Sequence, residues 1–441
     1  MKLERWQGMG TFGIVLAGEV VSFVGSGLTN FGIGVRIFQQ DRSITHFALV
    51  ALSTVLPLIL LSPIAGVLAD RFDRRRLLIL GNLGSAICSG ALFLSASAGR
   101  LEPWHIYPII ATSSAFASLI WPTLTAATTM LVRKDQFGHA SGMTQTGSAV
   151  SEMIAPALAG FLLVSVGLRA LILIDVCTFL FACLTLAIVK IPSPERREPV
   201  GLAGRQIFEQ LFVGWRFIRE RSGLLRLLGV ISGQNFCLGM VQVLITPLVL
   251  SFASPDMLGV VLSVASSGLL LGGLLMSVWG GSKRRVDSIL VAMTLQGALL
   301  MLGGVQPNAV LVTSAAFVFL LAIPVIVGSS QALWQSKVPP EVQGRVFATR
   351  RMIGGASLPL ALAVAGPLAD HVFEPLMARG GLLAGSVGRI LGAGEGRGIG
   401  LLFVVTGFVL LGVVVAAFRS GRLRSLEDEL PDAIGERAEE A

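Results

Sequence analysis

This chain of 441 residues has few cysteines, few histidines and little charge, and each shortage excludes a class of function. Its four cysteines lie in apolar stretches without paired spacing, so we expect buried thiols and neither disulfides nor a metal site. The sequence holds no Walker lysine loop and no zinc signature, and no nucleophile, base and orienting group converge in it. We therefore expect no cofactor, no metal and no enzymatic activity.

Charge is absent over long stretches of the chain. Charged residues make up only 14%, and none occurs from Ser288 to Ser336, a stretch divided by the turn-like segment 306–308. A bilayer core requires about 20 apolar residues per helix. Because similar stretches recur along the whole chain, the sequence predicts an all-α membrane protein with many spans.

Long uncharged runs between charged or Pro/Gly-rich breaks predict about twelve spans. Their expected starts are Met9, Ser43, Leu77, Pro103, Gly138, Ala170, Leu224, Asp256, Ser288, Ala309, Gly344 and Gly398. If the N-terminus is cytoplasmic, most of the 34 Lys and Arg residues lie on the inner side. Positive charge in short loops sets orientation, so we expect both termini inside. The net charge of +8 then indicates contact with an anionic inner leaflet rather than with nucleic acid.

The longest inner connection divides the chain into two halves. We predict an N-terminal six-helix half (1–190), a cytoplasmic linker (191–223), a C-terminal six-helix half (224–419) and an acidic tail (420–441) that is disordered from Glu427 to Glu440. Apolar residues recur at helical spacing from Phe208 to Ile218. They predict an amphipathic helix that lies either on the inner membrane surface or against the cytoplasmic end of the bundle.

The two halves resemble each other at a shift of 206 residues, as in Gly66 with Gly272 and Asp135 with Glu341. A shift of six spans preserves the inside-outside sense. Transporters built from such parallel halves hold their substrate between them near mid-membrane.

The connection between the second and third spans carries a specific motif. Gly66, Asp70, Arg71, Arg74 and Arg75 stand in Gly-Val-Leu-Ala-Asp-Arg-Phe-Asp-Arg-Arg-Arg, which resembles the motif of the major facilitator superfamily at that connection. The resemblance implies that the acid closes an inner gate against the start of span eleven. There the positive charge comes from Arg345, Arg350 and Arg351.

Further segments are similar to the macrolide-efflux and enterobactin-exporter branch of that superfamily, and the resemblance covers nearly the whole chain. They include Val21 to Thr29, Pro156 to Gly160 and Val338 to Phe347. Two motifs depart from the family pattern, at three residues. Asp73 replaces the usual loop glycine. In the span-five motif, which also contains Pro156 and Gly160, Ala155 and Ala159 stand where Gly is typical.

Two carboxylates fall deep inside expected spans. Glu19 lies roughly 15 Å into span one, and it forms a polar stripe with Ser22, Ser26 and Asn30 that we expect to face the central cavity. Glu152 lies deep in span five. An ionisable group in the bilayer points to function, so both are candidate proton carriers. The alternative is a carboxyl that stays protonated or is hydrogen-bonded between helices.

Asp175 stands close to Arg169 near the outer end of span six, so pairing at the helix end is as plausible as transport. Uncharged amides supply further cavity candidates, although hydrogen bonds between helices explain them nearly as well. These candidates are Gln145, Asn235, Gln242, Gln331 and Gln335.

The outer connection from Phe373 to Arg397 is long and rich in glycine. Long loops are usually functional or disordered. We expect a folded cap or short helix near 375–377 and 382–390.

Together these features predict a multi-pass transporter of the bacterial inner membrane, a monomer that exports a lipophilic drug-like or secondary-metabolite molecule (macrolide, siderophore or peptide) in exchange for protons. Export and substrate class rest on the resemblance. Uptake or lipid flipping by the same scaffold is the nearest alternative. A receptor or scaffold that does not transport is another, favoured by the basic central linker.

Overall fold

A computed structural model describes residues 8–99, 101–133, 136–189, 191, 204–282, 284–424 and 426–429. Within these ranges twelve helical segments are long and apolar enough to cross a membrane. They begin at Met9, Ile44, Arg74, Pro103, Gly142, Leu168, Ser222, Pro255, Arg285, Ala309, Val342 and Arg397. The predicted all-α fold and its twelve spans are confirmed, and each start agrees with the predicted one to about one helical turn.

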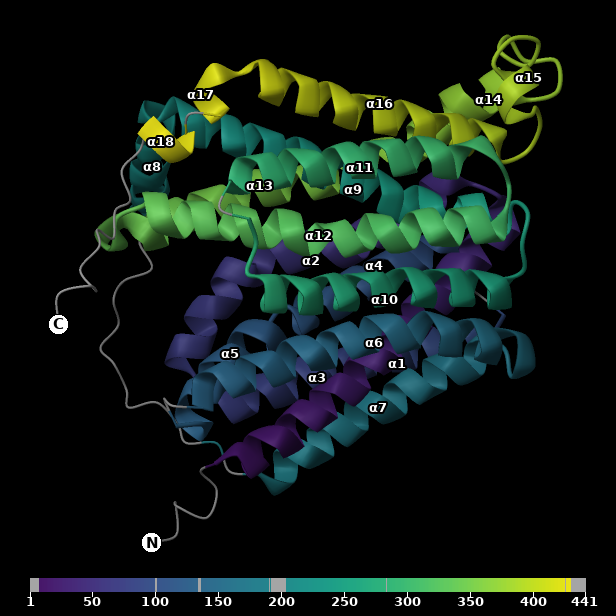
Figure 1. Cartoon of the computed structure of the whole chain (residues 1–441). Helices are drawn as coiled ribbons and strands as arrows, with labels where there is room; N and C mark the ends of the chain where they lie inside the picture. Colours follow the sequence, from purple (N-terminus) through teal and green to yellow (C-terminus); the bar gives the residue numbers. More distant parts are fainter. Residues whose placement is uncertain are drawn as a thin grey trace, which may run out of the picture. The chain divides into compact units, whose positions relative to one another are not determined.

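The chain forms two compact units (Figure 1). Unit 1 comprises residues 1–199 and 253–266, and unit 2 comprises residues 200–252 and 267–441. The helices of unit 1 are α1 (Met9–Asp41), α2 (Ile44–Arg71), α3 (Arg74–Ser97), α4 (Pro103–Ala117), α5 (Ile120–Leu131), α6 (Phe137–Ser165) and α7 (Leu168–Ile188), joined by the first part of α10 (Pro255–Trp279). Helix α1 packs against both α6 and α7, and α3 packs against α4 and α7.

Local chemistry explains where two of these helices begin and break. The side chain of Asp73 caps α3 by accepting a hydrogen bond from the backbone N–H of Arg76 at 2.8 Å, so this departure from the family pattern is a helix cap. The fourth span breaks between α4 and α5 at residues 118–119. Pro122 lies four residues after Ser118. Because proline has no backbone N–H, it cannot donate to the Ser118 carbonyl, and its ring crowds that carbonyl.

Helix α6 and the first turns of α10 approach closely in unit 1. A Cβ added at Gly160 would lie 2.7 Å from the carbonyl oxygen of Pro255 and 3.2 Å from the Cα of Gly259. The backbone N–H of Ala157 also donates to the hydroxyl of Ser263 at 2.9 Å. Gly160 and Gly259 therefore allow the backbones of α6 and α10 to touch over the turn that begins at Pro156.

Unit 2 contains the remaining helices. They are α8 (Gly204–Glu220), α9 (Ser222–Leu250), the rest of α10, α11 (Arg285–Val305), α12 (Ala309–Lys337), α13 (Pro340–Leu368), the π-helix η3 (Ala369–Phe373), α14 (Glu374–Met377), α15 (Gly388–Leu391), α16 (Arg397–Arg419), α17 (Gly421–Arg424) and α18 (Leu426–Glu429). Helix α11 packs against α12 and α16, and α9 packs against α13 and α16.

The long connection before α16 is folded, as predicted. Its two short helices, α14 and α15, lie at one end of α16 (Figure 1). Met377 and Leu391 are buried there in an apolar cluster with Leu401 of α16. The carboxylate of Glu374 accepts hydrogen bonds from the backbone N–H groups of Gly396 at 3.3 Å and Ile399 at 3.0 Å, which caps the start of α16.

The predicted amphipathic helix is α8, and it packs on unit 2. Ile218 is fully buried, and a Cβ at Gly214 would lie 2.5 Å from the backbone oxygen of Arg345 on α13. Phe212 stays exposed. Its packing on α13 agrees with the alternative of a helix held against the bundle, and its place at the cytoplasmic end stays a prediction.

The start of the acidic tail is docked rather than disordered, which corrects our expectation for Glu427. Leu426 is buried, and a Cβ at Gly223 of α9 would lie 2.6 Å from its side chain. The Glu427 carboxylate accepts from the backbone N–H of Arg285 at 2.8 Å, and its backbone carbonyl accepts from Nζ of Lys337 at 2.9 Å. Residues 430–441 lie outside the described ranges.

Candidate functional site

Buried carboxyl groups in unit 1

Glu19 lies fully buried in the interior of unit 1, on the side of α1 that meets α3. Its Oε1 accepts a hydrogen bond from Nδ2 of Asn82 at 2.9 Å. Asn82 also donates to the backbone carbonyl of Leu78 at 3.0 Å and accepts from the hydroxyl of Ser22 at 3.3 Å. The second carboxyl oxygen of Glu19, Oε2, is buried without a hydrogen-bond partner among the described residues.

Asp175 of α7 is the centre of a second buried cluster. This cluster lies farther along α1 and α3 than the cluster of Glu19. Asp175 is 2% exposed, and its two oxygens accept from the hydroxyls of Ser89 on α3 at 2.7 Å and Ser26 on α1 at 3.3 Å. A Cβ at Gly25 would lie 3.1 Å from Oδ1 of Asp175, so α1 approaches this carboxyl closely. Pairing with Arg169, one of the two alternatives for Asp175, is absent among the described contacts, and Arg169 is exposed.

The two acids lie in neighbouring polar clusters that share helices α1 and α3. Ser22 and Ser26 are one turn apart on α1, and Asn82 and Ser89 are two turns apart on α3. Glu19 and Ser26 are therefore separated by roughly 10 Å along the helix axis. In the described part of unit 1 neither carboxyl pairs with a cation, because all of their hydrogen-bond partners are neutral.

The predicted stripe on α1 does not share one environment. Glu19 and Ser22 are buried inside the unit, Ser26 is half-buried, and Asn30 is exposed. The face that carries Glu19 meets α3 within this unit, and the expectation that the stripe faces a central cavity stays a prediction. Glu152 of α6 is exposed.

A cationic cavity in unit 2

A cavity of about 330 Å³ lies between α9, α12 and α13 of unit 2. It brings together Asn235, Gln331, Arg350 and Arg351 of the predicted site residues. Its apolar wall comes from Leu228, Ile231, Leu238, Ile323, Ile326, Val327 and Phe347. Gln242, Gln335 and, from unit 1, the exposed Gln145 do not line it.

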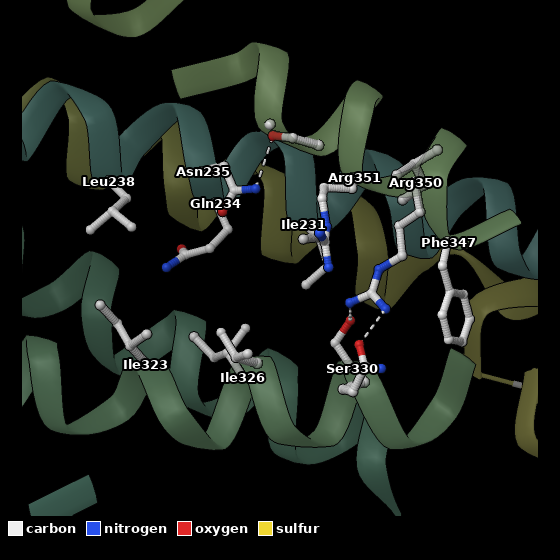
Figure 2. Close-up of a pocket in the computed structure, with 15 residues that line it drawn as sticks. Ile231, Gln234, Asn235, Leu238, Ile323, Ile326, Ser330, Phe347, Arg350 and Arg351 are labelled. Carbon is white, nitrogen blue, oxygen red and sulfur yellow. Dashed lines mark hydrogen bonds between the residues drawn. The ribbon is translucent and has the colours of Figure 1, made fainter. Parts of the chain in front are cut away.

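Arg350 reaches across this cavity to α12. Its guanidinium donates to Oε1 of Gln331 at 2.9 Å and to the hydroxyl of Ser330 at 3.1 Å (Figure 2), and it lies 5.2 Å from the ring centre of Trp334. Arg351 also lines the cavity and is exposed.

Two amides complete the wall. Asn235 donates to the backbone carbonyl of Gly354 at 2.9 Å. Gln234 donates to Gln296 of α11 at 2.8 Å, and Gln296 in turn donates to the carbonyl of Phe319 at 2.9 Å. The side-chain oxygen of Gln234 is buried and has no partner among the described residues.

The remaining motif residues have separate surroundings. Arg75 donates to the backbone carbonyls of Leu186 and Ala187, each at 2.7 Å, in the last turn of α7. Arg74 donates to the carbonyl of Ala69 at 3.4 Å, and Arg345 is exposed. The side chains of Asp70 and Arg71 lie outside the described residues, so the inner gate stays a prediction.

Sequence reasoning missed Asn82, Ser89 and Gln234, and it set Asp175 aside. A signal was present for the first two. Asn82 and Ser89 stand seven residues apart on one face of an apolar helix, which is the spacing of a polar seam. No comparable signal marked Gln234.

Comparison with known proteins

The family model of the Major Facilitator Superfamily matches residues 15–362 of this chain. The chain is 27% identical over 370 residues to macrolide efflux protein A of Streptococcus pyogenes, covering 82% of this chain and 90% of that protein. It is 25% identical over 371 residues to multidrug efflux pump Tap of Mycolicibacterium fortuitum, covering 81% and 88%.

A solved structure supports the same fold. A bacterial homologue of the human lysosomal transporter Spinster matches with a TM-score of 0.66 and 14% identity, covering 95% of this chain and 97% of that chain. The chain belongs to the major facilitator superfamily, whose members are transporters rather than enzymes. It is a multi-pass membrane protein with efflux proteins among its relatives.

Proposed function

We propose that this protein exports lipophilic drug-like or secondary-metabolite molecules across a bacterial inner membrane, driven by protons and by alternating access of two six-helix halves. The names of its relatives support export. We expect both termini to be cytoplasmic, because most of the positive charge falls on that side.

The observation that carries proton coupling is the pair of buried carboxyl groups in unit 1. Glu19 and Asp175 are at most 2% exposed, and their only described hydrogen-bond partners are neutral. An isolated carboxylate is costly in such surroundings, and protonation removes that cost. Each group can therefore bind a proton in one state of the transporter and release it when water gains access in another.

We infer a path between the two acids, because the clusters that hold them are neighbours on α1, with Ser22 and Ser26 one turn apart. Ser22 and Ser26 lie between Glu19 and Asp175, and a hydroxyl can both accept and donate a proton in a hydrogen bond. Glu152 remains a third candidate on α6. Its side chain is exposed within unit 1, whereas Glu19 and Asp175 are buried.

The proposal is tested in vesicles that contain the purified protein and a lipophilic fluorescent dye. An imposed pH gradient should drive dye transport in the wild type. Glu19→Gln and Asp175→Asn keep the shape of each side chain and remove its titration, so we expect both variants to lose the response to the gradient. Both should still exchange dye down its own gradient.

Glu220→Gln serves as the matched control, because Glu220 is an exposed acid that pairs with Arg216 on α8. It should respond to the gradient like the wild type. If Glu19→Gln, Asp175→Asn and their double variant all keep the wild-type response, neither acid carries the proton. The Glu152→Gln variant then becomes the deciding measurement for the remaining candidate.

A further inference from the structure

The cavity of unit 2 carries a charge arrangement that specifies a chemical class of ligand. Two neighbouring residues of α13, Arg350 and Arg351, line it, and no acidic residue does. A guanidinium within a membrane span is costly unless an opposite charge or strong acceptors compensate it. The two acceptors that Arg350 has, Gln331 and Ser330, are neutral. Its charge is therefore left without a counterion among the described residues of this unit.

The guanidinium of Arg350 also retains capacity for another partner. It has five N–H donors in a planar fork, and the described contacts use two of them. The bonds to α12 and the position over the Trp334 ring fix the direction of the side chain. A fork held in place in this way suits the flat, bidentate acceptors of a carboxylate, sulfonate or phosphate.

The end of the cavity opposite Arg350 has apolar residues in its lining. Figure 2 shows Arg350 and Phe347 at one end of the cavity and Leu238 and Ile323 at the opposite end. Gln234 lies toward that apolar end, but its side-chain oxygen is buried and not open to the cavity. The cavity thus has a cationic end and an apolar end.

We propose that this cavity binds amphipathic anions, with the acidic group on Arg350 and Arg351 and the apolar body against α9 and α12. This assignment rests on the proposed transport function and narrows its substrate class to molecules that bear an acidic group. The same chemistry is offered by an exported acid and by the headgroup of an anionic phospholipid, so the experiment distinguishes these two sources.

The test measures binding to purified protein in nanodiscs of phosphatidylcholine. The probe is 11-(dansylamino)undecanoic acid, and its primary amide is the matched uncharged probe. One charge-assisted bidentate contact stabilises a complex enough to favour the acid by roughly tenfold or more. We expect that preference in the wild type, its loss in Arg350→Gln, and its partial retention in Arg350→Lys.

Folding and general charge are controlled separately. Undiminished binding of the amide shows that Arg350→Gln is folded. Arg389→Gln removes an exposed arginine elsewhere in unit 2 and should keep the full preference. Equal binding of acid and amide to the wild type overturns the assignment, as does a preference for the acid that survives in Arg350→Gln.

Two further arms separate the ligand source and the proposed function. Phosphatidylglycerol added to the nanodiscs displaces the acid if a lipid headgroup occupies the site, and leaves its binding unchanged if the site is selective for the exported acid. Because binding is measured without a pH gradient, a failure of proton-driven transport would overturn the proposed function while the preference for the acid still stands.

Discussion

Arg75, in the motif between α2 and α3, should hold helices α3 and α7 together. Arg75 stands at the start of α3 and donates to the carbonyls of Leu186 and Ala187 in the last turn of α7. The last carbonyls of a helix have no partner within it and carry its negative partial charge. One side chain therefore satisfies two otherwise unpaired acceptors and neutralises the end of a helix. This role is structural, whereas the family resemblance implied a role in gating.

The size of the effect follows from the two contacts. A hydrogen bond from a charged group contributes about 1.5–3 kcal/mol when it is buried. The side chain of Arg75 is only half-buried, so water replaces part of what is lost. We expect Arg75→Ala to lower the free energy of unfolding by about 2 kcal/mol, a roughly thirtyfold change in the ratio of folded to unfolded protein. Arg75→Lys should cost about half as much, because an ammonium group lacks the planar fork that reaches both carbonyls.

The assay is reversible unfolding in mixed micelles, with transport measured per folded molecule alongside. Arg76→Ala is the matched control, because Arg76 is the next residue and its side chain is exposed. Its stability should equal that of the wild type. Unfolding of Arg75→Ala at the same denaturant concentration as Arg76→Ala would refute this role of Arg75. A stable Arg75→Ala protein that has lost transport would instead support the gating role.

Two further predictions concern the ends of other helices. Glu374→Ala removes the cap of α16 and should destabilise its first turn by about 1 kcal/mol, seen as faster hydrogen exchange there; exchange at the wild-type rate would contradict the cap. Gly160→Leu should force α6 away from α10, which a longer distance between spin labels at Val164 and Val260 would report. It should also lower transport. Gly142→Leu on the same helix meets open space and is its control. Equal label distances in the two variants would rule out close packing at Gly160.

The sequence was most informative about the spans and least informative about their neighbours. Uncharged runs ended by a proline or a charge predicted the starts at Met9, Pro103 and Ala309, because solvation by lipid depends on local composition. The partner of Glu19 could not be predicted in this way. Asn82 lies 63 positions away on another helix, and which faces of α1 and α3 meet is decided by packing across the whole unit.

Arg350 shows the same limit for a charged residue. The family resemblance implied a role at the inner gate, which stays a prediction. In the structure its side chain donates to Gln331 and Ser330 of α12, and its own segment did not predict these two acceptors. A long flexible side chain on a helix can serve either neighbour, and its own sequence segment does not record which one supplies the acceptors.

The docked start of the C-terminal tail bears on how this protein should be handled in experiments. Leu426 and Glu427 contact the ends of three separate helices, namely α9 through Gly223, α11 through Arg285 and α12 through Lys337. A truncation after Ser420 would therefore remove a peptide that links these helices. A purification tag fused there would take the place of Leu426 and Glu427 at the helix ends. Tags and reporter fusions belong beyond residue 429, and a loss of activity on shortening the chain further is expected to arise from loosened helix ends rather than from a missing signal.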